Sequence, residues 1–323
     1  MKIAPPSQTA KHIWEKDVEK QISRIRSDDS SFNRAALRLA ETSVFNRFAK
    51  HFFEAAYSDI YGSVAVAERS FINIGPGTSS HPYWTTVDKR YGDNFLWAQM
   101  RRQVQQSNPD LEWDILDRTQ LPFSDASIDL AYCSHVIEHV WDDDIHHLFR
   151  AVNRVLRPGA VFRLVCPDAD LLARAYSCGD WWYFLDYLML RARRLKLNQM
   201  DINKLRDSGF FARFVLEQVS LVTTKGNPFF VTQGEAPEFL ASFPTLTEAF
   251  ERASKLSDSQ LNRQLGAHVN WLNFSKLQNM LKEAGFSVVE RSGYRQSRAA
   301  VLRDDRFFDR TDPQMSLFVD AIK

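Results

Sequence analysis

The sequence predicts an α/β protein with a doubly wound, mostly parallel sheet of seven strands. Three observations lead to this prediction. Short apolar runs, typical of strands buried on both faces, alternate with helix-like segments between residues 71 and 168. Two further strand-like runs, "SVVERSGY" and "MSLFVDAIK", resume the pattern near the end of the chain. The stretch of about a hundred residues that separates these parts is helix-like, so we expect it to be inserted into the α/β domain.

The elements follow in order along the chain. Helical spacing before residue 67 predicts an N-terminal helical extension. The expected strands are "RSFINIG", "YWTTVDK", "LEWDIL", "IDLAYCS" and "AVFRLVCPD", and the helices between them are "NFLWAQMRRQVQQ" and "DDDIHHLFRAVNRVL". The predicted parts are the extension (1–66), the ligand-binding half of the sheet (67–168), a helical insertion covering an acceptor site (169–273), and a helix and strands that complete the sheet (274–323).

Composition limits the class of protein. The chain has 323 residues and is 44% hydrophobic, which is enough for a sizeable core. Its 41 basic and 40 acidic residues give a net charge of +1, so we expect no nucleic-acid partner. Three cysteines without a Cys-x-x-Cys pair indicate a reducing compartment. Because the sequence has no secretory apolar region and no long apolar run, we expect a cytoplasmic protein without a membrane span.

A glycine loop follows the first expected strand. Gly75 and Gly77 allow a sharp turn that brings backbone N–H groups close to a ligand. A dinucleotide site needs a third glycine, where this chain has Ser80, and a more distant acidic residue than Asp88. A nucleoside-type ligand without phosphates is therefore favoured, with Asp88 accepting from its ribose hydroxyls; the alternative is that Asp88 caps a turn. Only nine residues separate Ile74 from Trp84, which predicts a loop or a very short helix between these strands.

Several motifs in this region carry a resemblance to a known family. They are "INIGPG" (72–77), "TVDK" (86–89), "DRTQLPF" (117–123), "SHVIEH" (134–139) and "RVLRPGA" (154–160), with weaker support from "FSKLQNMLKEAGF" (274–286). The sequence resembles the S-adenosylmethionine-dependent methyltransferases with a Rossmann-like fold, in particular the group similar to methyltransferase type 11. The resemblance implies a Rossmann-like seven-stranded sheet and S-adenosyl-L-methionine as the cofactor.

The resemblance also implies which residues bind this cofactor: Asn73, Gly75, Pro76, Gly77, Asp88, Asp117, Arg118 and Ser134. In this interpretation the glycines line the methionine and ribose portions, and Asp88 holds the ribose hydroxyls. Asp117 accepts from the adenine amino group, with the Arg118 backbone beside the ring. The family often has an acidic residue where this chain has Asn73. The cofactor carries no phosphate, so carboxylates, backbone amides and apolar walls suit it on chemical grounds alone.

The string "HVIEH" also has the spacing of an inverted zinc-peptidase motif, through His135, Glu138 and His139. That motif belongs inside a helix, whereas here it directly follows an apolar strand. A zinc-dependent hydrolase using His135 and His139 is therefore a less favoured alternative, and we expect no metal site.

Methyl transfer to a hydroxyl requires alignment of the reactants and removal of a proton. The candidate bases, in order, are His135, Asp168 and His268, each of which could instead have a purely structural role. The predicted function is O-methylation of a small molecule or glycan. The alternatives are a nicotinamide-dependent redox enzyme and a non-catalytic, methyltransferase-like binding or partner subunit. Aromatic-rich helical segments suggest a homodimer.

Overall fold

The computed structural model describes residues 51–90, 108–184 and 209–323. The chain divides into two compact units, Met1–Glu68 and Arg69–Lys323. In the first unit, residues 51–67 form an α-helix. The second unit contains the sheet and all the predicted site residues. The helix expected in "NFLWAQMRRQVQQ" lies outside the described residues.

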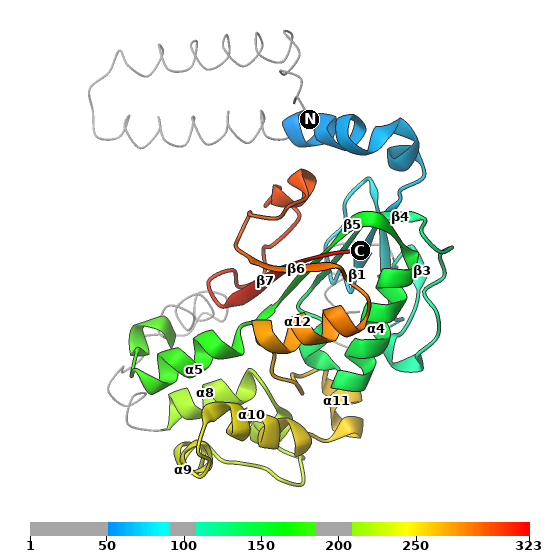
Figure 1. Ribbon diagram of the computed structural model, residues 1–323. Helices are drawn as coiled ribbons and strands as arrows, with labels where there is room; N and C mark the ends of the chain where they lie inside the picture. Colours follow the sequence, from blue (N-terminus) through cyan, green and yellow to red (C-terminus); the bar gives the residue numbers. More distant parts are fainter. Residues whose placement is uncertain (1–50, 91–107, 185–208) are drawn as a thin grey trace, which may run out of the picture. The chain divides into compact units, whose positions relative to one another are not determined.

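The second unit is built on one seven-stranded sheet with the order β3-β2-β1-β4-β5-β7-β6 (Figure 1). Its strands are β1 (Phe71–Ile74), β2 (Trp84–Asp88), β3 (Leu111–Glu112), β4 (Ile128–Ser134), β5 (Leu156–Pro167), β6 (Val288–Ser292) and β7 (Ser316–Ile322). The first five strands are parallel, and β7 runs antiparallel between β5 and β6. The predicted doubly wound, mostly parallel sheet is therefore confirmed.

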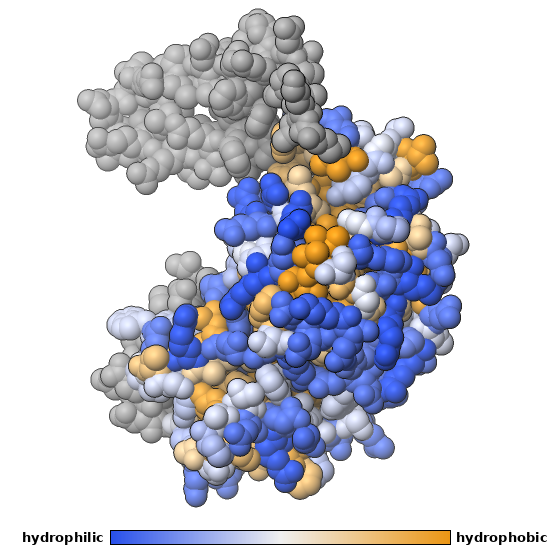
Figure 2. All heavy atoms as spheres, viewed as in Figure 1, coloured by the Kyte–Doolittle hydropathy of each residue, from blue (hydrophilic) through white to orange (hydrophobic). Residues whose placement is uncertain are grey.

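One face of the sheet is covered by two amphipathic helices, α4 (Asp142–Val155) and α12 (Phe274–Glu283), as Figure 1 shows. Their buried side chains pack on the apolar strands, while the surface over these helices is mostly hydrophilic (Figure 2). Three aspartates in the first turn of α4 stabilise the helix, because their negative charges interact favourably with the positive end of the helix dipole.

The opposite face of the sheet is covered by the segment 293–315, which includes the short helix η4 (Ala300–Arg303). Phe308 from this segment packs against Trp84 and Tyr132, with ring centroids 4.9 and 5.0 Å away. Both faces of the central strands are therefore buried, which explains why those strands read as continuous apolar runs.

The segment after β5 forms a second hydrophobic core beside the end of the sheet (Figure 1). Its elements are α5 (Ala169–Ser177), α8 (Phe210–Glu217), η3 (Leu221–Thr223), α9 (Ala236–Ala241), α10 (Leu246–Lys255) and α11 (Ser259–Leu265). This core includes Phe184, Phe211 and Phe250, which are almost completely buried. Across the described ranges, none of the helices combines the length and the apolar character needed to cross a bilayer.

The connection between β1 and β2 contains turns and no helix, as the short spacing predicts. His81 lies in this loop, 4.3 Å from the ring centroid of Phe307. Its Nδ1 atom accepts a hydrogen bond from the Tyr83 N–H at 3.1 Å. Burial lowers the pKa of His81 to about 4; Asp304 opposes this change and Arg306 adds to it. The folded protein therefore favours the neutral form of the His81 ring over the protonated form.

The position of His81 predicts that acid destabilises the second unit. The pKa of this group is lower in the folded state than the ordinary value of 6.5, so the unfolded chain takes up its proton first as the pH falls. The stabilisation is complete above pH 6.5 and is lost as the pH falls toward 4. Because of His81, we expect the free energy of unfolding to fall by about 1–2 kcal/mol when the pH is lowered from about 7 to about 5. Urea unfolding of the wild type and His81→Phe at both pH values measures this loss.

The matched control is His146→Phe, on α4. The free energy of unfolding of His81→Phe should fall less between the two pH values than that of the wild type or of the control. Equal losses in all three proteins would contradict the prediction.

Candidate active site

A cavity of about 610 Å³ lies beyond the carboxyl ends of β1, β2 and β4. Ligands of open α/β sheets bind at this edge, and the volume suits a nucleoside-sized molecule. Seven of the residues predicted from the sequence line it together: Gly75, Pro76, Gly77, Asp88, Ser134, His135 and His268.

The glycine loop forms one wall of the cavity. Gly75 and Gly77 have φ angles of 66° and 57°, which favour glycine. A Cβ atom on Gly75 would lie 2.3 Å from Cγ2 of Val136, so a larger residue is excluded by contact as well as by conformation. The Gly75 N–H donates to the Val87 carbonyl at 2.8 Å, which holds the loop at the end of the sheet. The loop therefore offers bare backbone to a ligand.

Asp88 ends β2 at the next wall and is only 7% exposed. Its Oδ1 atom accepts a hydrogen bond from the Lys89 N–H at 2.8 Å. The backbone carbonyl of Asp88 accepts a hydrogen bond from the Trp113 N–H at 2.9 Å. This bond connects the end of β2 to the segment after β3. A carboxylate held in this way at a strand end is suited to accepting hydroxyl hydrogen bonds.

The structure corrects the expected placement of Asp117 and Arg118. Both are exposed and lie outside the cavity, where the Arg118 Nε atom donates to Asp144 at 2.8 Å. The cavity is lined instead by residues 113–116, because β3 ends at Glu112 and the chain turns into η1 (Ile115–Asp117). Asp114 caps η1 by accepting from the Leu116 N–H at 3.0 Å. Asp114 is therefore the acidic side chain at this wall.

Two other sequence-based candidates also lie outside the cavity lining. Asn73 is buried within β1. Asp168 caps α5, with Oδ1 accepting from the N–H groups of Asp170 and Leu171. Its Oδ2 atom accepts from Arg291 at 2.6 Å. Both of its oxygens therefore accept hydrogen bonds outside the cavity lining.

His135 lies at the end of β4 with a φ angle of 54°, an uncommon conformation for a non-glycine residue. Its Nδ1 atom is 3.0 Å from Oε1 of Glu138. Its Nε2 atom is 3.0 Å from the Ser316 hydroxyl and 3.1 Å from the Thr311 carbonyl. Burial lowers the pKa of His135, but the charge and hydrogen bond of Glu138, together with Asp312 and Thr311, raise it overall. The carboxylate therefore orients the ring and favours its protonated form.

Glu138 is the most deeply buried acidic group in the cavity, with 1% of its side chain exposed. Burial opposes its charge, yet His135, His139 and His268 lower its pKa to about 2. Glu138 lies in the short 3₁₀ helix η2 (Ile137–His139), so the "HVIEH" string lacks the α-helix of an inverted zinc peptidase. The site instead contains a buried carboxylate surrounded by three imidazoles.

His268 reaches the cavity from the loop between α11 and α12. Its Nδ1 atom is 2.8 Å from the Gln218 carbonyl, and its ring centroid is 4.9 Å from that of His139. Burial and the nearby His139 lower the pKa of His268 to about 4, against the attraction of Glu138. His268 is therefore a neutral ring above that pH.

Sequence reasoning missed several residues that line the same cavity. They come from four separate parts of the chain: Trp113, Asp114, Ile115 and Leu116; Gln218; Asn262, Arg263 and Gly266; and Arg310, Thr311, Asp312 and Met315. Only Asp114 had a usable signal, as the second acidic residue, after Glu112, within the expected third strand. The other residues are brought together only by tertiary packing, and no sequence motif identifies them.

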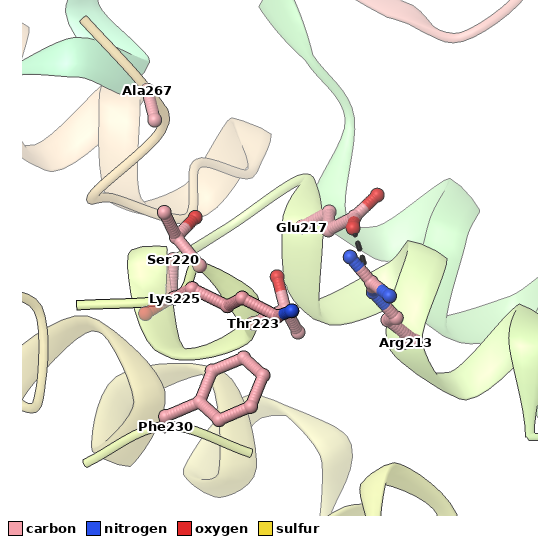
Figure 3. A pocket seen from close by; sticks show the side chains of 8 residues that line it. Arg213, Glu217, Ser220, Thr223, Lys225, Phe230 and Ala267 are labelled. Carbon is pink, nitrogen blue, oxygen red and sulfur yellow. Dashed lines mark hydrogen bonds and ion pairs between the residues drawn. The ribbon is translucent and has the colours of Figure 1, made fainter. Parts of the chain in front are cut away.

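A second pocket, of about 420 Å³, lies beside α8 and η3 (Figure 3). It contains none of the predicted site residues, and its Arg213 is paired with Glu217 at 2.9 Å. The ring of Phe230 lies on the other side of this pocket (Figure 3). The larger cavity at the sheet edge is therefore the candidate active site.

Comparison with known proteins agrees with this placement. Residues 73–164, from β1 into β5, match the family model described as a methyltransferase domain. No curated protein matches the chain.

Solved structures that are similar to this chain include three S-adenosylmethionine-dependent methyltransferases. The protein from Mesorhizobium loti is 14% identical, covers 78% of this chain and 90% of its own, and has a TM-score of 0.35. The one from Methanosarcina mazei is 13% identical, with 78% and 91% covered and a TM-score of 0.36. The one from Thermotoga maritima, described as a possible histamine N-methyltransferase, is 12% identical, with 86% and 98% covered and a TM-score of 0.32.

Proposed function

This chain carries a methyltransferase domain of the Rossmann-like, S-adenosylmethionine-dependent class, and we propose that it methylates an oxygen atom of a small molecule or glycan. One observation carries this proposal: a single cavity joins the glycine loop and Asp88 to two histidines, His135 and His268. The glycine loop and Asp88 suit a cofactor with ribose hydroxyls, and the two histidines suit an acceptor that must lose a proton.

The cavity walls fit S-adenosylmethionine, which supplies an activated methyl group when bound. The bare backbone of Gly75 and Gly77, both of which line the cavity, would accept close approach of the methionine and ribose portions. Asp88 would accept hydrogen bonds from the ribose hydroxyls. Asp114 would take the place beside adenine that the sequence assigned to Asp117, with the buried side chains of Trp113 and Ile115 as apolar walls.

His135 is the proposed proton acceptor. Glu138 fixes its Nδ1 side at 3.0 Å and stabilises the imidazolium, so His135 acts as a base only after Nε2 has released the proton that it shares with the Thr311 carbonyl, 3.1 Å away. The neutral His268, whose Nε2 atom lies 4.0 Å from the same Oε1 atom of Glu138, is another candidate. Asp168 was also predicted as a base, but both of its carboxylate oxygens accept hydrogen bonds outside the cavity lining, which makes it the least favoured of the three.

We assign the acceptor site to the insertion at residues 169–273. Gln218, Asn262, Arg263 and Gly266 from this segment line the cavity together with the cofactor-loop residues. Polar groups from a separate helical subdomain beside the reactive end of the cavity support a role as a cover over the acceptor.

The proposal is tested by titrating the purified chain with S-adenosylmethionine and S-adenosylhomocysteine in a calorimeter, followed by a methyl-transfer assay. A panel of phenols, monosaccharides and oligosaccharides provides oxygen acceptors, and release of S-adenosylhomocysteine is the readout. Binding with transfer to at least one hydroxyl is expected. Absence of binding by folded protein would overturn the proposal, and transfer only to amines would overturn its oxygen specificity. Binding without transfer to any acceptor would favour a non-catalytic subunit.

The variant His135→Gln is expected to lose methyl transfer by roughly a hundredfold or more while it still binds S-adenosylhomocysteine. Glutamine can keep a hydrogen bond to Glu138 but cannot accept the acceptor's proton. The assay compares initial rates at saturating cofactor, with His147→Gln on α4 as the control. A rate within a few-fold of the wild type would exclude His135 as the base.

A further inference from the structure

Three side chains in the cavity form a cluster that the proposed methyl transfer does not account for. Glu138, His139 and His268 each present a potential ligand atom, and these atoms lie within 4.8 Å of one another. Glu138 and His139 come from η2, whereas His268 comes from the loop after α11. All three line the candidate active site.

The hydrogen bond of His268 determines which of its nitrogens faces the cluster. Nδ1 lies 2.8 Å from the Gln218 carbonyl, which can only accept, so Nδ1 carries the proton. Nε2 then has a lone pair, and it lies 4.0 Å from Oε1 of Glu138. Histidines that bind metals are held in this way, with the second nitrogen donating to a carbonyl or carboxylate.

Polar atoms of the cluster are buried without hydrogen-bond partners. Within the described part of the chain, Oε2 of Glu138 and Nδ1 of His139 have none. Leaving such atoms unsatisfied is unfavourable, and more so for a charged group. Glu138 also keeps its charge in a site where its side chain is 1% exposed. A cation between these atoms would satisfy them together.

We propose that Glu138, His139 and His268 bind a divalent transition-metal ion of the zinc class at the wall of the candidate active site. Two imidazoles and one carboxylate favour zinc, cobalt or iron over magnesium and calcium, which prefer sets of oxygen ligands. Three protein ligands leave a position open on the cavity side, as in catalytic zinc sites. His135, 3.0 Å from the same carboxylate, is a second-sphere residue that orients it.

The role of this ion rests on the proposed methyl transfer. The open position would take the acceptor hydroxyl and lower its pKa. The O–H proton passes to Nε2 of His135 in its neutral form. An oxygen lone pair then forms the bond to the methyl carbon while the carbon–sulfur bond breaks and its electron pair stays on sulfur. The products are a methyl ether and S-adenosylhomocysteine, and no oxidant or reductant is needed.

The experiment uses the full chain, freed of metal with a chelator and then dialysed. Co²⁺ is titrated while its visible d–d absorption is followed, and Zn²⁺ is titrated in a calorimeter. One equivalent of each is expected to bind, with tetrahedral or five-coordinate cobalt bands. His268→Gln and His139→Gln should each weaken binding by roughly a hundredfold or more. The control His146→Gln changes a histidine on α4 and should bind as the wild type does.

The same proteins are titrated with S-adenosylhomocysteine, which separates this inference from the proposed function. If the variants bind S-adenosylhomocysteine but the wild type binds cobalt no more tightly than they do, the metal site is overturned and the methyltransferase proposal stands. If the wild type binds one cobalt through these histidines but no S-adenosylhomocysteine, the metal site stands and the proposed function fails. Near-ultraviolet circular dichroism of each variant identifies any that has lost its fold, and His268→Asn then replaces His268→Gln.

Discussion

Replacement of Asp88 by alanine is expected to weaken binding of S-adenosylmethionine by about a hundredfold or more. A carboxylate that accepts two ribose hydroxyl hydrogen bonds contributes about 1.5–3 kcal/mol for each bond, and two such bonds correspond to at least a hundredfold in affinity. The position allows little compensation, because Asp88 ends β2 and is only 7% exposed. Calorimetric titration with S-adenosylmethionine measures the loss directly, and S-adenosylhomocysteine, which has the same ribose, should show a similar loss.

The variant Asp88→Asn distinguishes an effect of the lost carboxylate charge from an effect of misfolding. Asparagine keeps the volume and an oxygen that can accept from the Lys89 N–H, so this variant should fold normally yet bind more weakly than the wild type. The control is Asp125→Ala, which removes an aspartate in a turn whose side chain is 77% exposed and pairs with Arg154. Wild-type affinity in both Asp88 variants would contradict the assignment of Asp88 to the ribose.

Replacement of Arg163 by methionine is expected to lower the free energy of unfolding by about 3–5 kcal/mol. Arg163 lies in β5, is fully buried and pairs with Asp309 and Asp320 on the face of the sheet opposite α4. It also donates to the Ser292 hydroxyl and the Gly293 carbonyl, both at 2.9 Å. Removal of the guanidinium leaves two buried carboxylates without their partner, and this is the source of the large cost.

Denaturant unfolding near neutral pH measures this effect. The control is Arg298→Met, which removes a surface arginine paired with Glu290 and should cost no more than about 1 kcal/mol. The loss should become smaller in acid, because burial raises the pKa of Asp309 and its protonation removes one unpaired charge. A loss in Arg163→Met as small as that of the control would show that the buried network is not needed for stability.

The pattern of the sheet could be predicted because its strands are buried on both faces. Each expected strand from "RSFINIG" to "MSLFVDAIK" corresponds to an observed strand, and the central ones are apolar because they are buried on both faces, whereas β3 and β6 at the two edges are more exposed. The length of the third strand was predicted wrongly. "LEWDIL" has the composition of a six-residue strand, but the chain leaves the sheet after Glu112 and forms η1. That difference moves the acidic residue at the cavity wall from Asp117 to Asp114.

The glycine loop, Asp88, Ser134 and His135 could be identified because each follows a strand, and parallel strands end at one edge of the sheet. The same rule also selected Asp168, which follows β5 but turns away to cap α5. Position at a strand end therefore identifies candidates, and side-chain direction then separates binding residues from caps.

The sequence by itself determined the class of fold, the cofactor edge of the sheet and the family resemblance, because local apolar patterns and glycine turns express these features over short stretches of chain. Only the tertiary structure decided that His268 meets Glu138 and His139, and that Arg163 meets Asp309 and Asp320. These groups are far apart in the sequence, and their chemistry depends on distances of a few ångströms. Such contacts form when distant segments pack together, and no spacing along the chain specifies them.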